Sequence, residues 1–347
     1  MSEQPPAKPS RRTARRASFR IGDIEVASGR SGTGELPIAR LVTGTHISLP
    51  LRVFHGAHDG PTVWLSAAVH GDEVAGVEII RRALEAVDPR GLRGTIIAVP
   101  IVNVHGFLSG DRYLPDRRDL NRSFPGSATG SLAGRLANLF MTQVVQRCDV
   151  GIDLHTGSDH RTNLPQIRAD LDDPDTRALA EAFGAPFMLH AKLRDGSMRA
   201  AATAAGATVL LFEGGEAWRL DETAVAVGVR GIGRVLRQLD MTDDDLPELP
   251  VAIESRSSGW IRARRSGIAS MHVGLGDRVE KGATLATIHD SVGVRVSSMK
   301  ATRTGLVIGH SHQPLVNQGD AIVHIADIGI DQLPSNHRSR RNSKDFS

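Results

Sequence analysis

The sequence predicts an α/β protein with two parts: a three-layer domain built on a mixed sheet, and a small all-β domain that follows it. Between residues 62 and 239, β-branched apolar runs alternate with segments whose apolar residues recur at helical spacing. This alternation is typical of helices packed on both faces of a sheet. After the acidic, proline-containing stretch TDDDLPELP, only short strands separated by turns are expected.

The predicted elements follow one another without long gaps. From Phe19 to about Val53, short alternating segments separated by glycine-rich turns indicate β-strands. Next, the apolar run PTVWLSAAV predicts a buried strand, and the segment after it has the apolar spacing of a helix. In this alternating part we expect strands at residues 62–69, 94–100, 149–154 and 207–212, and helices at residues 72–87, 130–147, 174–184, 197–205 and 220–239.

Composition and charge are those of an ordinary globular chain. It has 347 residues, of which 40% are hydrophobic and 23% charged, and its net charge is +3. No apolar run approaches the roughly 20 residues that span a bilayer, and the N-terminus lacks the apolar core of a secretory signal. The single cysteine, Cys148, excludes an internal disulfide and a zinc site made of cysteines. We therefore expect a cytoplasmic protein without a membrane partner.

The basic excess lies at the two ends of the chain, in RRTARR and HRSRRNSK. Such runs can contact nucleic acid or a membrane surface. No aromatic residues are interleaved with them to stack on bases, so we expect solvated arms and no nucleic-acid partner. The expected organisation is a disordered basic arm over 1–20, a catalytic domain over 21–245, a β-domain over 251–328 and a disordered basic tail over 331–347.

Three segments place metal-ligating side chains at the ends of expected strands. His70 and Glu73 form an H-x-x-E pair after one strand, His155 ends another in DLHTGS, and Glu213 ends a third in VLLFEGGE. Alone, the first pair could be a strand-ending histidine and a glutamate that complements a helix dipole. Together, two imidazoles and a carboxylate leave the fourth position of a catalytic zinc open for water, whose pKa bound zinc lowers to about 7. A further carboxylate can then take the proton.

The polar loop GDRYLPDRRDLNRSFPG supplies groups that can hold a substrate. Arg112, Asn121 and Arg122 offer cationic and amide contacts, and the planar fork of arginine suits a carboxylate. The alternative is an ordinary solvated loop. Tyr113 and Phe124 favour a loop that is packed against the protein.

Taken in order, the H-x-x-E pair, DLNR, DLHTGS and the late strand-end glutamate resemble the succinylglutamate desuccinylase/aspartoacylase family, whose members are related to the zinc carboxypeptidases. The resemblance covers roughly residues 40–330, including the C-terminal β-domain that this family carries. It implies a zinc-carboxypeptidase-like catalytic domain, a barrel-sandwich-like β-domain and one Zn²⁺ per chain. By the same resemblance, His70, Glu73 and His155 match the zinc ligands, and Glu213 matches the general base and acid.

The resemblance also implies roles for the polar loop. Arg112 matches the arginine that polarises the scissile carbonyl, but the loop before DLNR is longer than in aspartoacylase, and Arg117 or Arg118 could take that part. The residues expected to bind the substrate are Asn121 and Arg122, which match the pair that grips its carboxylate, and Arg168, which resembles a position near the substrate pocket.

Other histidines and one acid near these motifs are expected to have supporting roles. His55, His58 and His160 should lie at the surface or beside the site, and should not bind the metal. Asp153 could orient a ligand histidine or cap the end of its strand. Arg161 is a further candidate for substrate binding.

The sequence thus predicts a zinc-dependent hydrolase that removes an acyl group from an N-acyl amino acid or a related small amide. Zinc-bound water activated by Glu213 attacks the carbonyl, and zinc and Arg112 stabilise the oxyanion. Glu213 then protonates the amine. Two alternatives stay open: a zinc carboxypeptidase acting on peptides, and a non-catalytic carrier or interaction protein that uses the β-domain. The sequence is compatible with a homo-oligomer and does not name the acyl group or the amine.

Overall fold

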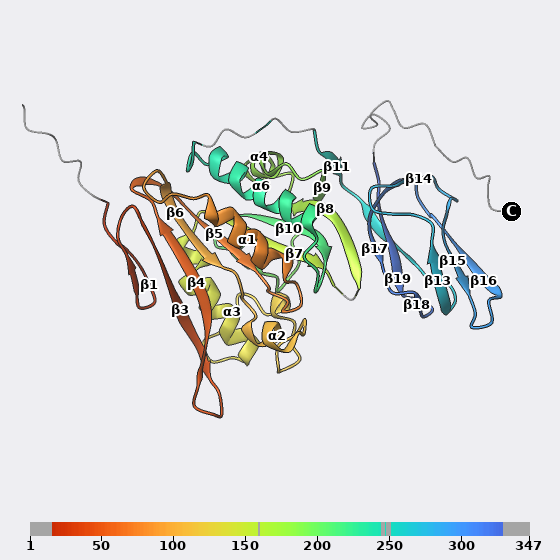
Figure 1. Ribbon diagram of the computed structural model, residues 1–347, viewed down its shortest axis with the longest axis horizontal. Helices are drawn as coiled ribbons and strands as arrows, with labels where there is room; N and C mark the ends of the chain where they lie inside the picture. Colours follow the sequence, from red (N-terminus) through yellow and green to blue (C-terminus); the bar gives the residue numbers. More distant parts are fainter. Residues whose placement is uncertain (1–15, 159, 244–246, 248–250, 329–347) are drawn as a thin grey trace, which may run out of the picture.

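The structure, a computed structural model, has a large mixed sheet with helices on both faces, and the sheet extends into a C-terminal region made of strands (Figure 1). It describes residues 16–158, 160–243, 247 and 251–328. Within these residues, no helix has the length and apolar character needed to cross a membrane.

The predicted basic ends lie mostly outside the described residues. All of the tail over 331–347 is outside them. The last residues of the arm expected over 1–20 are described, and they are packed against the protein. Arg16 Nη1 donates to the carbonyl oxygen of Gly94 at 2.8 Å, and Phe19 begins the first strand. The expected arm is therefore too long at its C-terminal end.

The strands predicted between Phe19 and Val53 are present as two antiparallel hairpins. Pairing in the second, longer hairpin runs from Arg30 opposite His55 to Arg40 opposite His46. The strands are β1 (Phe19–Ile21), β2 (Ile24–Val26), β3 (Arg30–Arg40) and β4 (His46–His55).

The central part alternates strands and helices, as the apolar spacing predicts. All four predicted strands and all five predicted helices occur, with ends shifted by up to four residues. The elements are β5 (His58–Ala67), α1 (Ala75–Glu85), β6 (Arg93–Val99), α2 (Val104–Ser109), the 3₁₀ turn η1 (Leu120–Arg122), α3 (Leu132–Gln143), the 3₁₀ turn η2 (Val145–Arg147), β7 (Val150–Gly157), β8 (Arg161–Ala169), α4 (Pro174–Phe183), β9 (Phe187–His190), α5 (Met198–Ala204), β10 (Thr208–Glu216) and α6 (Glu222–Gln238).

Besides the 3₁₀ turn η1, three elements of this part, α2, β8 and β9, were not predicted. No helix was predicted after the strand expected over 94–100, but Asn103 starts α2 by accepting a hydrogen bond from the Gly106 amide at 2.8 Å. Pro165 lies inside β8, and a proline ordinarily argues against a strand interior. β9 has only four residues, too few to show an alternating pattern.

The main sheet is mixed, as predicted, and its centre is parallel. Its order from one edge is β3, β4, β6, β5, β7, β10, β8. Strands β6, β5, β7 and β10 run parallel, and β4 and β8 flank them antiparallel. The carboxyl ends of the four parallel strands therefore meet along one edge, which is where α/β sheets bind ligands.

Helices cover both faces of this sheet and confirm the three-layer architecture (Figure 1). Helices α1, α4 and α6 enclose one apolar core with residues such as Ile79 and Phe183, and α3 and α5 enclose the other around Trp64 and Phe140. Trp64 is fully buried because β7 offers it a glycine: a Cβ on Gly151 would lie 1.9 Å from Trp64 Cζ2.

The C-terminal region (residues 251–328) is all strand and turn among its described residues, as predicted. None of its segments forms a helix. Its strands are β11 (Ile253–Ser255), β12 (Ser258–Arg262), β13 (Gly267–Met271), β14 (Arg278–Val279), β15 (Thr284–His289), β16 (Arg295–Lys300), β17 (Gly305–Ser311), β18 (Leu315–Val316) and β19 (Ala321–Ala326).

These strands form two layers, and one layer continues the main sheet. Strands β16, β15, β13 and β18 make a separate four-stranded sheet. Strands β12, β19 and β17 extend the main sheet, because β17 pairs with the start of β8, with Gly309 opposite Asn163. A core that includes Leu285 and Val323 lies between the two layers. The C-terminal region is therefore joined to the helical part by backbone hydrogen bonds, close to the edge at which the parallel strands end.

Candidate active site

A tight turn after β5 brings His70 to the edge of the sheet. β5 ends at Ala67, and Ala68 has a positive φ of 47°, a conformation that costs a residue with a side chain about 1–2 kcal/mol. The turn lies directly on α2: a Cβ on Gly71 would be 2.0 Å from the carbonyl carbon of Gly106. Only a glycine fits beside His70, so the packing on α2 fixes the backbone that presents this histidine.

Glu73 lies in the same turn. Helix α1 begins at Ala75, three residues later than predicted, so Glu73 precedes the helix. Gly76 lets the helix approach the sheet closely, since a Cβ there would lie 2.7 Å from Ala67 Cβ and 2.9 Å from Leu154 Cβ. The two glycines around the H-x-x-E pair therefore serve close packing.

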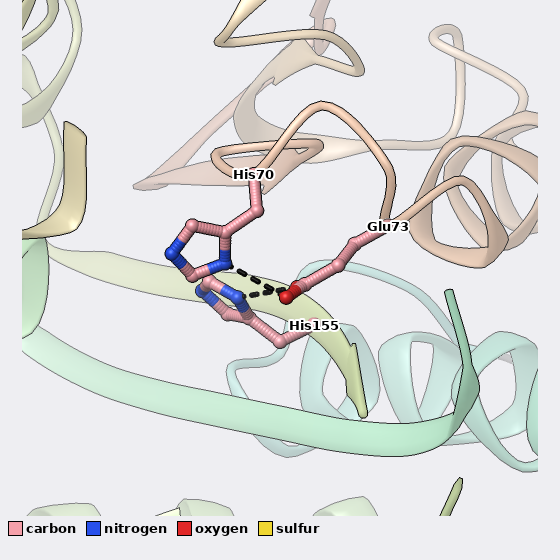
Figure 2. A group of neighbouring side chains, drawn as sticks. All are labelled: His70, Glu73 and His155. Carbon is pink, nitrogen blue, oxygen red and sulfur yellow. Dashed lines mark hydrogen bonds and ion pairs between the residues drawn. The ribbon is translucent and has the colours of Figure 1, made fainter. Parts of the chain in front are cut away.

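His70, Glu73 and His155 converge in the structure (Figure 2). The Nδ1 atom of His70 lies 2.8 Å from Glu73 Oε1, and the Nδ1 atom of His155 lies 2.8 Å from Glu73 Oε2. The three residues are only 4%, 2% and 4% exposed. Side chains that are 82 residues apart in the chain thus share one buried carboxylate.

Carboxylates face the outer nitrogen of each imidazole. His155 Nε2 lies 2.8 Å from Asp153 Oδ2, and Asp153 also accepts a hydrogen bond from Ser66 Oγ at 2.7 Å. His70 Nε2 lies 3.3 Å from Asp119 Oδ1. An ionised carboxylate only accepts hydrogen bonds, so it favours a proton on Nε2 and leaves Nδ1 as the metal-binding atom. Asp153 was expected either to orient a ligand histidine or to cap the end of its strand. Its contact with His155 supports the first of these roles.

The charges of this cluster depend on one another. Burial alone would raise the pKa of the Glu73 carboxyl, but His70 and His155 hold that pKa well below its usual range. Burial opposes protonation of His155, yet Asp153 and Glu73 raise its pKa well above the ordinary value. The pKa of His70 is raised in the same way, against burial, by Glu73 and Asp119.

The residues present fit a divalent metal. Ligand atoms of His70, Glu73 and His155 all lie within 4.8 Å of one another, and all three side chains are buried. Two imidazole nitrogens and a carboxylate are the donor set of many catalytic zinc sites, in which a fourth position is left for water or substrate. The cluster can therefore hold a metal, and its donor chemistry suits zinc.

Glu213 lies next to this cluster on the neighbouring strand. It is opposite His155 in the parallel pairing of β10 with β7. Asn163 Nδ2 donates to Glu213 Oε2 at 2.7 Å, and Arg168 Nη1 lies 3.5 Å from Glu213 Oε1. β10 continues to Glu216, so Glu213 does not end its strand as predicted; a register shift follows it. A partly exposed carboxylate is thus held at both oxygens beside the candidate metal site.

A cavity of about 340 Å³ opens over these residues. Among the residues that the structure describes, its lining contains seven cationic side chains and two carboxylates, those of Glu73 and Glu213. A cavity with this imbalance attracts an anionic ligand. The cationic residues are Arg112, Arg122, Arg161, Arg168, Lys192, Arg194 and Arg199.

Among the arginines considered for the carbonyl, Arg112 is the one that lines the cavity. Its Nη1 lies 3.2 Å from Glu73 Oε1, and its Nη2 lies 3.5 Å from Asp119 Oδ2. Arg117 and Arg118 are exposed and do not line the cavity. The geometry therefore favours Arg112 over the two alternatives.

Asn121 and Arg122 of η1 also line the cavity. Asn121 Oδ1 accepts a hydrogen bond from the Met198 amide at 2.8 Å, an arrangement that leaves its Nδ2 group available to a ligand. The loop is packed at Phe124, which is 4% exposed, but Tyr113 is 48% exposed. The expectation that Tyr113 helps to pack the loop is wrong.

Several residues of the site were missed in the sequence. Asp119 belongs to the quoted motif DLNR, and an acid three residues before a candidate arginine was a usable signal. Asn163 lies in the unpredicted strand β8. Trp260 of β12 lines the cavity, with its ring stacked on His324 at a centroid distance of 4.7 Å. No local pattern marked Asn163 or Trp260, because both reach the site through pairing between distant strands.

The other histidines follow the expectation in part. His58 and His160 are exposed. His55 is buried: its Nε2 lies 2.8 Å from the carbonyl oxygen of Ala17, and its Nδ1 lies 3.0 Å from Thr95 Oγ1. His55 is thus neither at the surface nor beside the site, and it ties the N-terminal segment to the sheet.

Comparisons with known proteins agree with this fold. The model of the succinylglutamate desuccinylase/aspartoacylase catalytic domain matches residues 59–239, more than half of the chain. The protein therefore belongs to the succinylglutamate desuccinylase/aspartoacylase family.

Three relatives cover nearly the whole chain. An N-alpha-acetyl-L-2,4-diaminobutyric acid deacetylase from Halomonas elongata is 28% identical, over 88% of this chain and 94% of that protein. The product-bound structure of the ectoine utilization protein EutE (DoeB) from Ruegeria pomeroyi is 25% identical with a TM-score of 0.78, over 87% of this chain and 97% of that one. A succinylglutamate desuccinylase/aspartoacylase structure from Rhodobacter sphaeroides is 27% identical with a TM-score of 0.78, over 90% of this chain and 100% of that one.

Proposed function

We propose that the protein is a zinc-dependent deacylase that hydrolyses the amide bond of N-acyl amino acids. The observation that carries the proposal is the convergence of His70 Nδ1 and His155 Nδ1 on the two oxygens of Glu73, under a cavity with a cationic lining. Membership of the family supports the reaction class. The name of the Halomonas elongata relative, a deacetylase of an N-alpha-acetyl amino acid, supports the substrate class.

His70, Glu73 and His155 would hold one Zn²⁺ per chain. A bound zinc ion supplies Lewis acidity and lowers the pKa of water toward about 7. Asp153 keeps the His155 ring in place through the contact at Nε2. The other parts of the reaction belong to side chains that do not bind the metal.

Glu213 is the proposed general base and acid. It accepts the proton of the attacking water and gives it to the departing amine. Its position opposite His155 supports this role, because Glu213 lies beside the proposed metal ligands and is not needed as one of them. The contacts with Asn163 and Arg168 hold the carboxylate, so it does not have to be ordered when the substrate arrives.

The cationic side chains divide the remaining roles. Arg112 faces the negative charge that develops on the amide oxygen, which such donors stabilise in the transition state. Asn121 Nδ2 and Arg122 bind the substrate carboxylate, because a planar guanidinium can pair with both of its oxygens. We propose that Arg168 assists this binding while it contacts Glu213.

The cavity supports a small anionic substrate. At about 340 Å³ it has the size of a small-molecule site, and the excess of cations favours a substrate that carries a free carboxylate.

The test is a panel of N-acyl amino acids, with formyl, acetyl, succinyl and benzoyl groups, assayed for release of the free amine by zinc-loaded protein. Matching amides that lack the carboxylate and short peptides with a free C-terminus form the comparison sets. Glu213→Gln should keep its zinc and lose about 10²-fold or more in kcat, the usual scale of acid–base catalysis.

Two results would contradict the proposal. Faster turnover of peptides than of every N-acyl amino acid would make the protein a carboxypeptidase. Loss of zinc in Glu213→Gln would make Glu213 a ligand and not the base.

A further inference from the structure

We propose that Asn163 and Gly309 act together to position Glu213, so that the C-terminal region takes part in assembling the active site. The inference rests on the proposed role of Glu213 as the proton-transfer group. Asn163 is the group in contact with Glu213, and Gly309 provides the space in which Asn163 can lie.

An irregularity in β8 places Asn163 near Glu213. In the pairing with β10, Glu213 is opposite Gln166, and Gly215 is opposite Asn163. Two residues of β8, one of them Pro165, therefore stand against a single residue of β10. Such a bulge bends a strand and re-aims the side chains beyond it. Pro165 is tolerated at this point because a bulged residue need not donate to the ladder.

The contact between the two side chains is short and directed. Asn163 Nδ2 donates to Glu213 Oε2 at 2.7 Å. Asn163 is 5% exposed, and both residues line the catalytic cavity. A hydrogen bond from a buried amide to a carboxylate fixes the direction of that carboxylate more firmly than a contact with water does. The other oxygen, Oε1, lies 3.5 Å from Arg168 Nη1.

Gly309 of β17 lies directly beneath this amide. It is opposite Asn163 in the antiparallel pairing of β17 with β8. A Cβ at this position would lie 2.9 Å from Asn163 Oδ1 and 3.2 Å from the carbonyl oxygen of Thr162. A Cβ essentially never lies within 3.0 Å of another atom in this way, so a side chain at residue 309 would shift the Asn163 amide from its present place.

Gly309 therefore links the C-terminal region to Glu213, the proposed proton-transfer group. The backbone of β17 holds the start of β8 by strand pairing, from Gly309 to Ser311. The missing side chain leaves room for the amide, and the amide holds Glu213. The strand pairing and the hydrogen bond to Glu213 are direct contacts between neighbouring residues, and Gly309 leaves the space between them.

Three variants test the link on zinc-loaded, full-length protein. Asn163→Ala removes the donor and should lower kcat by about 10- to 100-fold, the scale of a lost hydrogen bond to a charged group, with little change in KM or zinc content. Asn163→Asp keeps the shape but replaces the donor with a carboxylate, so its kcat should fall at least as far. If Asn163 served packing alone, Asn163→Asp would lower kcat less than Asn163→Ala does.

Gly309→Ala tests the same link from the C-terminal region. It should lower kcat by displacing the amide, and a crystal structure of the variant should show Asn163 Nδ2 out of hydrogen-bond distance of Glu213. In the double variant with Asn163→Ala, the second change should add little, whereas independent effects would multiply. Gly274→Ala is the matched control, because a Cβ there meets nothing closer than Asp277 Oδ2 at 4.0 Å, and it should keep wild-type kinetics.

The outcomes separate this inference from the function on which it rests. Wild-type kcat in Asn163→Ala and Asn163→Asp, with an inactive Glu213→Gln, would overturn the inference and leave the function standing. An active Glu213→Gln would overturn the proposed function first. If Asn163→Ala does not fold, a folded Gly309→Ala decides: reduced kcat with the amide displaced supports the link, and wild-type kcat overturns it.

Discussion

The change Asp153→Asn probes how the candidate metal site is held together. Asp153 is 1% exposed, and its two oxygens have different partners: His155 Nε2 at 2.8 Å and Ser66 Oγ at 2.7 Å. Asparagine has the same shape, so the variant removes the charge without opening a cavity. If the new amide turns its NH₂ group toward His155, Nε2 must accept, and the proton moves to the metal-binding Nδ1. If it turns its oxygen toward His155, the ring keeps its orientation but loses a charged partner.

Both arrangements weaken metal binding. Partners of ligand histidines are worth about 10- to 100-fold in metal affinity, which corresponds to about 1.4–2.8 kcal/mol. The loss should appear in the dissociation constant for zinc, measured by competition with a chromophoric chelator. The chain should stay folded, because the volume of the side chain is unchanged.

The control for this prediction is Asp149→Asn. Asp149 precedes the same strand, β7, and its Oδ2 accepts a hydrogen bond from the Thr62 amide at 2.8 Å, away from the site. This variant should bind zinc as the wild type does. Zinc affinity equal to wild type in Asp153→Asn would refute the reasoning, since it would show that Asp153 does not orient His155.

Three further predictions concern other parts of the structure. Replacing Arg122 with Ala should lower kcat/KM by about 10- to 150-fold on substrates with a carboxylate, and Lys should not restore it, because it lacks the planar fork; an equal loss on amides without the carboxylate would contradict this role. Burial, with the charges of Arg168 and Arg303, lowers the pKa of His324 to about 3. The unfolded chain therefore binds more protons between about pH 6.5 and 3, and stability falls as the pH is lowered through this window, by up to about 1.4 kcal/mol per unit. His324→Phe should reduce the slope of the unfolding free energy against pH, measured by urea unfolding at several pH values. An unchanged slope would contradict the assignment of this pH dependence to His324. Gly151→Ala forces a Cβ against Trp64 and should destabilise the fold by about 1–3 kcal/mol, whereas an unchanged urea midpoint would disprove the close fit.

Local pattern in the sequence was enough for the layers of the fold. The apolar run before His70 and the helical spacing after Glu73 predict β5 and α1, and these two elements bring the pair to the sheet edge. The same reasoning places His155 and Glu213 near the ends of two buried strands, although β7 continues to Gly157 and β10 to Glu216. Parallel strands end at one edge, so their terminal side chains meet without any knowledge of the loops.

What the sequence did not show depends on pairing between distant segments. Nothing near Asn163 indicates that it will meet Gly309, since the two are far apart in the chain and each lies in an irregular strand. Trp260 likewise reaches the cavity only because β12 extends the main sheet. A helix cap also went unrecognised: Asn103 begins α2 shortly after the strand predicted over 94–100, where no helix was expected.

Metal content is the direct test of whether the buried cluster is a zinc site. Plasma emission analysis of purified protein should find about one zinc per chain, and His70→Ala and His155→Ala should each abolish it. His190→Ala is the matched control, because His190 lies with Asp170 and Asp172 in a second, more exposed cluster of the described residues. It should keep full zinc. Full zinc in His155→Ala, or its loss only in His190→Ala, would contradict the account.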